Sequence, residues 1–272
     1  MIGFNGGLIG ETRTTTLGPS VPGVWTAREQ AEARRNGAWP LGDVDPSYAS
    51  VSVLLHGDGT NNSTTFTDNG PNNFVLTGAG NAKISTAQSK FGGASLLFDG
   101  NGDYITGTLA DANAFNLPND FTVEAFIYLA TTAGSHCIAC KWGGTGHFAF
   151  IFYVTGTSIE FASGNNGQFG AITTAATTFS SNTWYHVAAS RSGSSLRLFL
   201  DGSLLTTATE TRDCSSANTV SRLFVGGNQD GIVNNPTFAF YFNGYIEELR
   251  ITKGVARYTA AFSPPTAPFP NS

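Results

Sequence analysis

The sequence predicts an all-β protein, a two-sheet antiparallel sandwich preceded by a short, helix-bearing N-terminal arm. Only 12% of the 272 residues are charged, 33 are glycine and 12% are aromatic, a composition that suits short strands and tight turns better than helices. Apolar residues alternate with a period of two in several short segments, and turn residues separate these segments. Such spacing is typical of an all-β sandwich and not of βαβ units.

The arm, residues 1–48, contains the one convincing helix signal. Thr26 and Glu29 have the spacing of a capping box, in which each side chain accepts a hydrogen bond from the other residue's backbone N–H. Residues 27–36 are good helix formers, and Pro40 prevents continuation soon afterwards. We therefore expect one short helix in the arm.

Two tryptophans, Trp25 and Trp39, bracket this helix in a segment too short to have its own core. They either dock onto the sandwich or anchor the arm to another protein chain, because tryptophan is a common interface anchor. Arg28, Arg34 and Arg35 lie on the same helix. We predict that these five residues form an assembly interface.

The strands follow from residue 49 onward. Residues 121–129 alternate so that their odd positions form one apolar face. Residues 148–154 are apolar throughout, as a strand buried on both faces would be. Further strands are expected at residues 51–56, 196–200, 203–205, 238–242 and 245–252. The Pro-rich residues 263–272 cannot pair in a sheet and are expected to form a C-terminal tail.

Cys137 and Cys140 have C-x-x-C spacing, which could indicate metal or redox chemistry. They lie in a strand-like run, however, and residues three apart in a regular strand point to opposite faces. No second cysteine pair accompanies them, since Cys214 stands alone. We therefore expect the pair to be buried thiols.

Seven phrases, in order, resemble the laminin-G-like branch of the concanavalin-A-like lectin/glucanase jelly rolls. They are Phe91–Gly100, Asp103–Ile105, Phe121–Ala125, Trp184–Ala188, Leu198–Gly202, Val225–Gly227 and Phe242–Ile251. Each phrase alone is weak, but the ordered set is specific. The resemblance implies that residues 49–262 form a jelly roll.

The segment before these phrases has a resemblance of its own. Gly23–Thr26, then Trp39-Pro40, then Ser52–Thr60 are similar to structural proteins of tailed marine bacteriophages, in which such jelly rolls are appended to the virion. This match is shorter and less specific. It implies that residues 1–48 bind other virion proteins of the capsid or tail, and that the chain is a decoration, fibre or tail-associated subunit.

Charge and hydropathy exclude other classes. The formal net charge is −5, and no Lys/Arg run exists that could neutralise phosphates, so nucleic acid is not expected as a partner. No apolar run is long enough to span a membrane. The N-terminus lacks the basic and apolar regions of a signal peptide. We expect a virion location, with release by host lysis.

Because the resembled family contains glycanases, catalysis has to be considered. Glycoside hydrolysis needs two carboxylates across one sugar, which on a strand means acids two or four residues apart. Glu124 and Glu160 each stand alone in apolar strands, and Glu247 and Glu248 are adjacent. The sequence therefore predicts no catalytic residues and no enzyme.

Calcium is a further possibility, because hard cations prefer clustered oxygen ligands. Asn228–Asp230 resembles the calcium-binding acid–amide–acid string of pentraxins, but Asn228 replaces the first acid, and Gly156–Ser158 stands where pentraxins supply an Asp-Asn pair. Glu247 occupies the place of an acid that holds calcium in related glucanases, with Asp58 or Asp99 as companions. The alternative is that these Asp-Gly sites are ordinary turns.

Glycan binding requires aromatic platforms beside amide and carboxylate groups in exposed loops. The candidates are Trp142, Gln168, Phe169, Asn228, Gln229 and Asp230. The leading hypothesis is a non-enzymatic virion structural protein whose jelly roll touches host-surface polysaccharide. The alternatives are a free carbohydrate-binding lectin and a glycanase. Analogy with phage fibres suggests a homo-oligomer.

Overall fold

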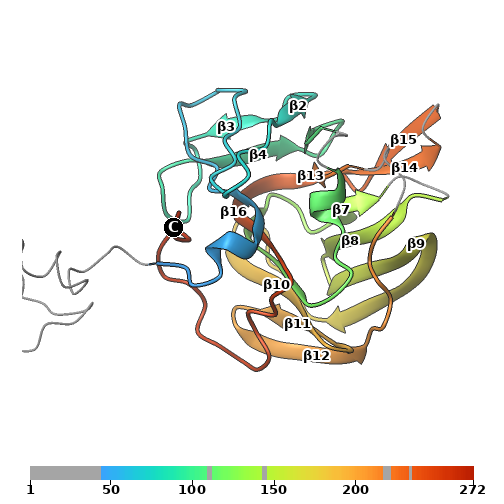
Figure 1. Ribbon diagram of the computed structural model, residues 1–272. Coiled ribbons are helices and arrows are strands. Elements are labelled where there is room, and N and C mark those ends of the chain that lie inside the picture. The colour runs from blue at the N-terminus through green and yellow to red at the C-terminus, as the bar shows by residue number, and fades with distance from the viewer. Residues whose placement is uncertain (1–43, 109–111, 143–145, 217–221, 233–234) are drawn as a thin grey trace, which may run out of the picture. The chain divides into compact units, whose positions relative to one another are not determined.

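The computed structural model describes residues 44–108, 112–142, 146–216, 222–232 and 235–272, without the side chains of residues 112 and 229–239 (Figure 1). The chain divides into two units, Met1–Asp45 with Ser272, and Pro46–Asn271. The helix expected at residues 27–36 and the five residues of the expected assembly interface lie outside the described residues. No described helix is long and apolar enough to cross a membrane.

The second unit is built from two antiparallel sheets, which confirms the predicted all-β sandwich (Figure 1). The eight-stranded sheet has the order β12 (Ser203–Thr209), β11 (Ser195–Leu200), β10 (Trp184–Ser192), β6 (Phe121–Leu129), β16 (Asn243–Lys253), β4 (Ser95–Asp99) and β3 (Lys83–Ser85), with β1 (Val51–Leu55) also paired to β16. The six-stranded sheet has the order β2 (Thr77–Ala79), β5 (Tyr104–Thr106), β13 (Phe224–Val225), β7 (Ser135–Trp142), β8 (Phe148–Thr155) and β9 (Ser158–Ala176).

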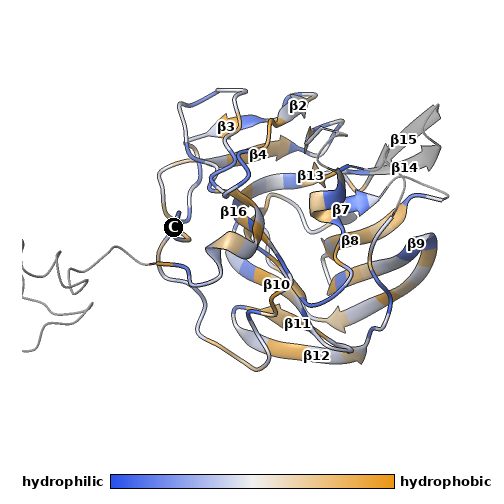
Figure 2. Cartoon of the chain, in the orientation of Figure 1, coloured by the Kyte–Doolittle hydropathy of each residue, from blue (hydrophilic) through white to orange (hydrophobic). Residues whose placement is uncertain are grey.

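Three smaller elements complete the described part. β14 (Asn228–Ile232) and β15 (Asn235–Ala239) form a separate two-stranded sheet. The short 3-10 helices η1 (Tyr48–Ser50) and η2 (Ala112–Phe115) are the described helical turns. Figure 2 shows apolar residues concentrated along the strands, as burial between two layers requires.

The core lies between the two sheets, and the alternation of residues 121–129 accounts for its middle. Their odd positions, Phe121 to Leu129, are fully buried in the main core cluster. The Phe161 ring stacks on Phe121 and Phe150, with centroids 5.2 and 5.9 Å apart. β8 is buried on both faces, as its uninterrupted apolar sequence predicted, because Ile151 and Tyr153 belong to a second cluster outside the sandwich core.

The two cysteines of β7 depart from the expected geometry. Cys137 and Cys140 are buried free thiols, as expected, but both belong to the outer cluster, whereas Ile138 and Ala139 face the core. The register with β8 shifts between Cys137 and Ala139. This β-bulge adds one residue to the strand and returns Cys140 to the face of Cys137.

The C-terminal segment covers the outer face of the eight-stranded sheet. Tyr258 and Phe262 stack on each other with centroids 3.6 Å apart, and both contact the ring of His186 on β10. Phe269 is 4% exposed, and its N–H donates to Glu248 over 2.8 Å. Residues 263–271 add no strand to either sheet, as their prolines predicted, but they pack against the sheet instead of extending as a free tail.

Candidate functional site

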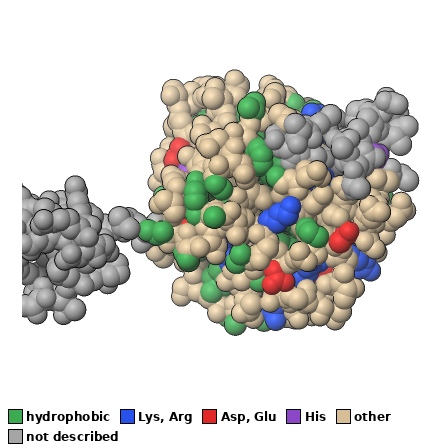
Figure 3. All heavy atoms as spheres, in the orientation of Figure 1, with side chains coloured by type: hydrophobic (Ala, Val, Ile, Leu, Met, Phe, Trp, Pro, Cys, Tyr) green, Lys and Arg blue, Asp and Glu red, His purple; other side chains and the backbone are tan. Residues whose placement is uncertain are grey.

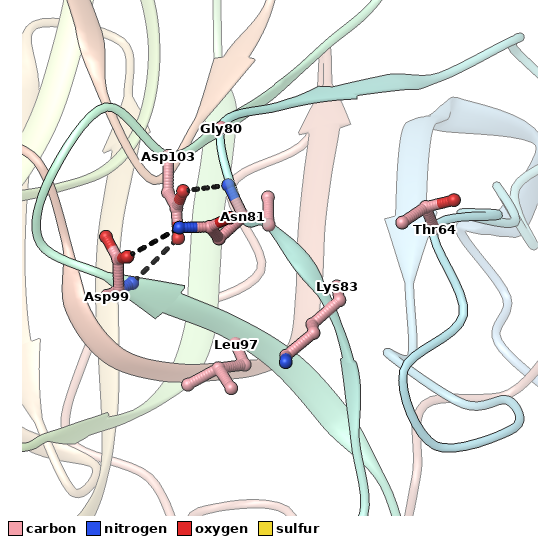
Figure 4. A pocket seen from close by; sticks show the side chains of 8 residues that line it. Thr64, Gly80, Asn81, Lys83, Leu97, Asp99 and Asp103 are labelled. Carbon is pink, nitrogen blue, oxygen red and sulfur yellow. Dashed lines mark hydrogen bonds between the residues drawn. The ribbon is translucent and has the colours of Figure 1, made fainter.

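A polar pocket of about 400 Å³ lies at one edge of the sandwich (Figure 4). Two turns run beside each other there, and both cross from one sheet to the other. The first turn joins β2 to β3, and the second joins β4 to β5. The pocket is lined by Thr64, Gly80, Asn81, Ala82, Lys83, Leu97, Asp99 and Asp103.

Asp103 holds the two crossing turns together. Its carboxylate accepts hydrogen bonds from the N–H of Asn81 in the first turn and from the N–H of Asp99 at the end of β4, the latter over 2.8 Å. Gly80 fits this clamp with φ of 65°, and a Cβ there would lie 2.3 Å from the Asp103 carboxylate. Burial raises the pKa of Asp103, although both backbone bonds oppose the rise. The pocket is therefore preformed.

Asp99 and Asn81 supply the open polar groups of the pocket. The exposed Asp99 carboxylate accepts from the Asn81 side-chain amide over 3.1 Å and from the N–H of Asn101 over 2.8 Å. Within the described residues, no protein group donates to Asn81 Oδ1, and none accepts from the ammonium group of Lys83. Leu97, paired with Lys83 across β3 and β4, adds a partly exposed apolar surface.

This arrangement suits a polyhydroxylated ligand. A hydroxyl group donates to a carboxylate or an amide oxygen and accepts from an ammonium group, and the pocket offers all three. Hydrolysis would require a second free carboxylate across the sugar. Asp103 is fully buried and its oxygens hold backbone amides, so Asp99 is the one carboxylate of this pocket that faces solvent.

The sequence-predicted aromatic residues form a separate surface cluster. Trp142 and Phe169 meet with ring centroids 6.0 Å apart, and Phe148, which the sequence analysis did not single out, lies 4.4 Å from Trp142. Phe169 is 54% exposed, whereas Trp142 is 7% exposed. Gln168 is exposed beside them. The cluster therefore presents one open ring, without a described pocket around it.

Asn228 does not join that cluster. Val225 pairs with Ala139, so Asn228, three residues later, lies towards the beginning of β7, whereas Trp142 is its last residue. Asn228 is 3% exposed, and its Oδ1 has no hydrogen-bond partner among the described residues. Gln229 and Asp230 are in β14, but their side chains lie outside the described residues.

Of the three acids considered for calcium, Glu247 and Asp58 lie beside one loop, and Asp99 lies in the pocket. Glu247 accepts hydrogen bonds from the N–H groups of Lys90, Phe91 and Gly92. Asp58 lies beside the same loop, because a Cβ on Gly92 would be 2.0 Å from its Oδ1, whereas Asp99 belongs to the pocket. Among the described residues no three acidic, His or Cys side chains form a group that could hold a metal. Backbone amides, which are donors, occupy the Glu247 carboxylate.

Figure 3 shows scattered acidic and basic side chains on one face of the molecule and no basic patch there.

The comparisons with known proteins identify the class. Residues 99–257 match the Laminin_G_3 family, the concanavalin A-like lectin/glucanases superfamily, and the chain belongs to this family. The fold is that of the concanavalin A-like lectins and glucanases. No curated protein matches the sequence.

Several solved structures share the fold. Domain 4 of AbnA, an extracellular arabinanase of Geobacillus stearothermophilus solved with arabinotriose, is 14% identical with a TM-score of 0.54, over 76% of this chain and 94% of that one. The binding domain of Paraclostridial Mosquitocidal Protein 1 is 15% identical (TM-score 0.53; 79% and 50% covered). The botulinum neurotoxin serotype D binding domain is 13% identical (TM-score 0.53; 77% and 49% covered). The chain thus spans about half of each toxin domain.

Proposed function

We propose that the chain is a non-enzymatic, glycan-binding structural subunit of a virion. The jelly roll binds surface polysaccharide through the pocket of Asn81, Lys83 and Asp99, and residues 1–48 attach the chain to other virion proteins. The observation that carries the binding function is the pocket itself, which is lined by a carboxylate, an amide oxygen and an ammonium group.

Two further observations support glycan binding without catalysis. The arabinanase domain of the same fold was solved with a bound trisaccharide, which agrees with a neutral sugar as ligand. The burial of Asp103 leaves the pocket with one solvent-facing carboxylate, and glycoside hydrolysis uses two. A glycanase is therefore the weakest of the three hypotheses.

The virion part of the proposal rests on the phage-like segments Gly23–Thr26, Trp39-Pro40 and Ser52–Thr60. A decoration, fibre or tail-associated subunit would meet host-surface polysaccharide outside the cell after lysis, and would work as a homo-oligomer. Neither nucleic acid nor a membrane is a partner in this proposal. The alternative is a free lectin whose arm only completes its own fold.

Loss of the open polar groups should weaken binding. We expect Asp99→Ala to weaken binding of the best ligand from a glycan array by about tenfold or more, because a hydrogen bond to a charged group contributes about 1.5–3 kcal/mol. Asn81→Ala should weaken it by a smaller factor, because a hydrogen bond to a neutral amide contributes about 0.5–1.5 kcal/mol. Isothermal titration of the full chain measures this. Phe169→Ala is the matched control at the aromatic cluster and should change little. If Phe169→Ala alone lost binding, the glycan site would be the aromatic cluster and not the pocket.

The arm is tested through its tryptophans. We expect the full chain to form a defined oligomer. The double variant Trp25→Ala/Trp39→Ala should form a smaller assembly, because buried tryptophans contribute much of an interface's binding free energy. Light scattering measures the mass of both. If the full chain and the variant are identical monomers, the arm belongs to the domain's own fold and the free-lectin hypothesis replaces the virion one.

A further inference from the structure

A second hollow, of about 420 Å³, adjoins the polar pocket. The segments Thr64–Asp68 and Asn73–Leu76 line it, and Thr64 also lines the first pocket. In Figure 4, Thr64 lies on the side of the pocket opposite Asp99 and Asp103. The two hollows are therefore neighbours along one edge of the molecule, with Thr64 between them.

The second hollow differs from the first in its chemistry. Its hydroxyl groups come from Thr64, Thr65 and Thr67, which are exposed. Val75 is 69% exposed, and the half-buried Phe74 lies next to it. Together they offer hydroxyls beside apolar surface, which matches a sugar ring with its polar rim and its C–H face.

Asp68 gives the second hollow its shape and leaves it without a free charge. This carboxylate is 3% exposed. Its oxygens accept from the N–H groups of Leu54, Gly70 and Phe74 over 3.0, 2.8 and 2.9 Å. The segment on either side of the hollow is thus tied to β1 by a buried acid. The remaining lining is neutral.

We propose that the two hollows form one groove that binds an internal stretch of a linear, neutral polysaccharide. The proposal rests on the glycan-binding function and specifies its ligand class. One sugar unit sits among Asn81, Lys83 and Asp99, and the next units pass Thr64 onto Thr65 and Val75. A chain end would fill only one hollow, whereas two hollows that share the wall residue Thr64 can accept a continuing chain.

The groove is tested by varying the length of the oligosaccharide ligand. Titration calorimetry on the full chain would use linear arabinose, glucose and mannose oligosaccharides of one to six units. We expect affinity in one series to rise about tenfold or more from the single sugar to the longer members, as the second hollow fills. The double variant Thr65→Ala/Val75→Ser should remove this gain and leave the affinity for the shortest ligand unchanged.

Both substituted side chains are exposed, so the fold should persist, and a melting curve checks this. Leu204→Ser, on an exposed leucine of β12 that is 40% exposed, is the matched control and should keep the full gain. Affinity that does not change with chain length, or a double variant that keeps the gain, overturns the groove. In that case Asn81→Ala still reports on the pocket alone. Absence of binding across all three series overturns the groove together with the proposed function.

Discussion

Replacing Glu124 with Gln should lower the free energy of unfolding by about 3–5 kcal/mol, the cost of leaving a buried charge without its partner. Glu124 is fully buried on β6. Its carboxylate accepts from Arg250 Nη2 over 2.8 Å, from Tyr258 over 2.7 Å, and lies 3.2 Å from His186 Nε2. The neutral amide of Gln would remove the Glu124 charge from beside the buried Arg250 guanidinium, which is 5% exposed.

The same cluster around Glu124 makes the stability of the fold depend on pH in the acid range. Burial alone would raise the pKa of Glu124, but Arg250, His186 and Tyr258 outweigh it and lower the pKa to about 2. A carboxylate with a depressed folded-state pKa stabilises the fold above its unfolded pKa and loses that contribution as pH falls towards the folded value. We therefore expect wild-type stability to decrease between about pH 4.5 and 2, with a smaller decrease in Glu124→Gln.

Urea unfolding of both chains, at pH 7 and along the acid series, measures these effects. Glu160→Gln is the matched control, because Glu160 is a partly exposed strand glutamate that accepts from Tyr153 and Ser158. Its cost should stay near 1 kcal/mol. A Glu124→Gln cost as small as the control's would contradict the structural role of the cluster.

His56 should fasten the C-terminal segment in a pH-dependent way. Its Nδ1 lies 2.6 Å from Glu248 Oε1, and its Nε2 lies 2.6 Å from Asn271 Oδ1. The protonated ring, which carries an N–H on each nitrogen, can donate to both oxygens. Glu248 also accepts a hydrogen bond from the N–H of Phe269. The Arg250 guanidinium lies over the Phe269 ring, 3.6 Å from its centroid. We expect His56→Ala to cost about 2–3 kcal/mol at pH 6.

The pH dependence follows from the direction of the pKa shift. Burial lowers the pKa of His56, but the hydrogen bonds to Glu248 and Asn271 and the charges of Glu248 and Asp58 raise it, with a net rise. A raised pKa means that the stabilisation is complete below the unfolded value, about 6.5, and is lost as pH rises through the folded value. Unfolding curves from pH 6 to pH 9 should converge for wild type and His56→Ala. A constant difference across this range would mean that His56 acts by packing alone.

Local sequence patterns predicted the strands, because the alternation of apolar and polar residues and the flanking turn residues are both contained in each strand's own segment. Phe121–Leu129 was expected with the bounds that the structure has. The β-bulge at Ile138 was not predictable, because a bulge arises from pairing with β8 and leaves no mark in the alternation of β7. The Glu124 cluster was missed for a related reason, since its partners lie 62 to 134 residues away in sequence.

The candidate site was predicted only in part. Asp99 was singled out, but as a calcium ligand or a turn residue, because its partner Asn81 lies 18 residues away on another turn. Trp142 and Phe169 were both singled out as glycan-binding candidates, and their ring centroids lie 6.0 Å apart. Asp103 and Gly80 could have been noticed in the sequence, because Asp103 belongs to the Asp103–Ile105 phrase and Gly80-Asn81 is a turn signal. Their contact could not, because the sequence does not show that the two sheet-crossing turns lie side by side.

Glycan binding in the groove from Asp99 to Val75 can be mapped residue by residue on the full chain. Backbone-amide NMR spectra would be recorded with and without the best-binding oligosaccharide. We expect ligand-induced shifts at Thr64, Asn81, Lys83 and Asp99, and also at Val75 with longer ligands. Shifts centred on Trp142 and Phe169, or confined to residues 1–45, would contradict it.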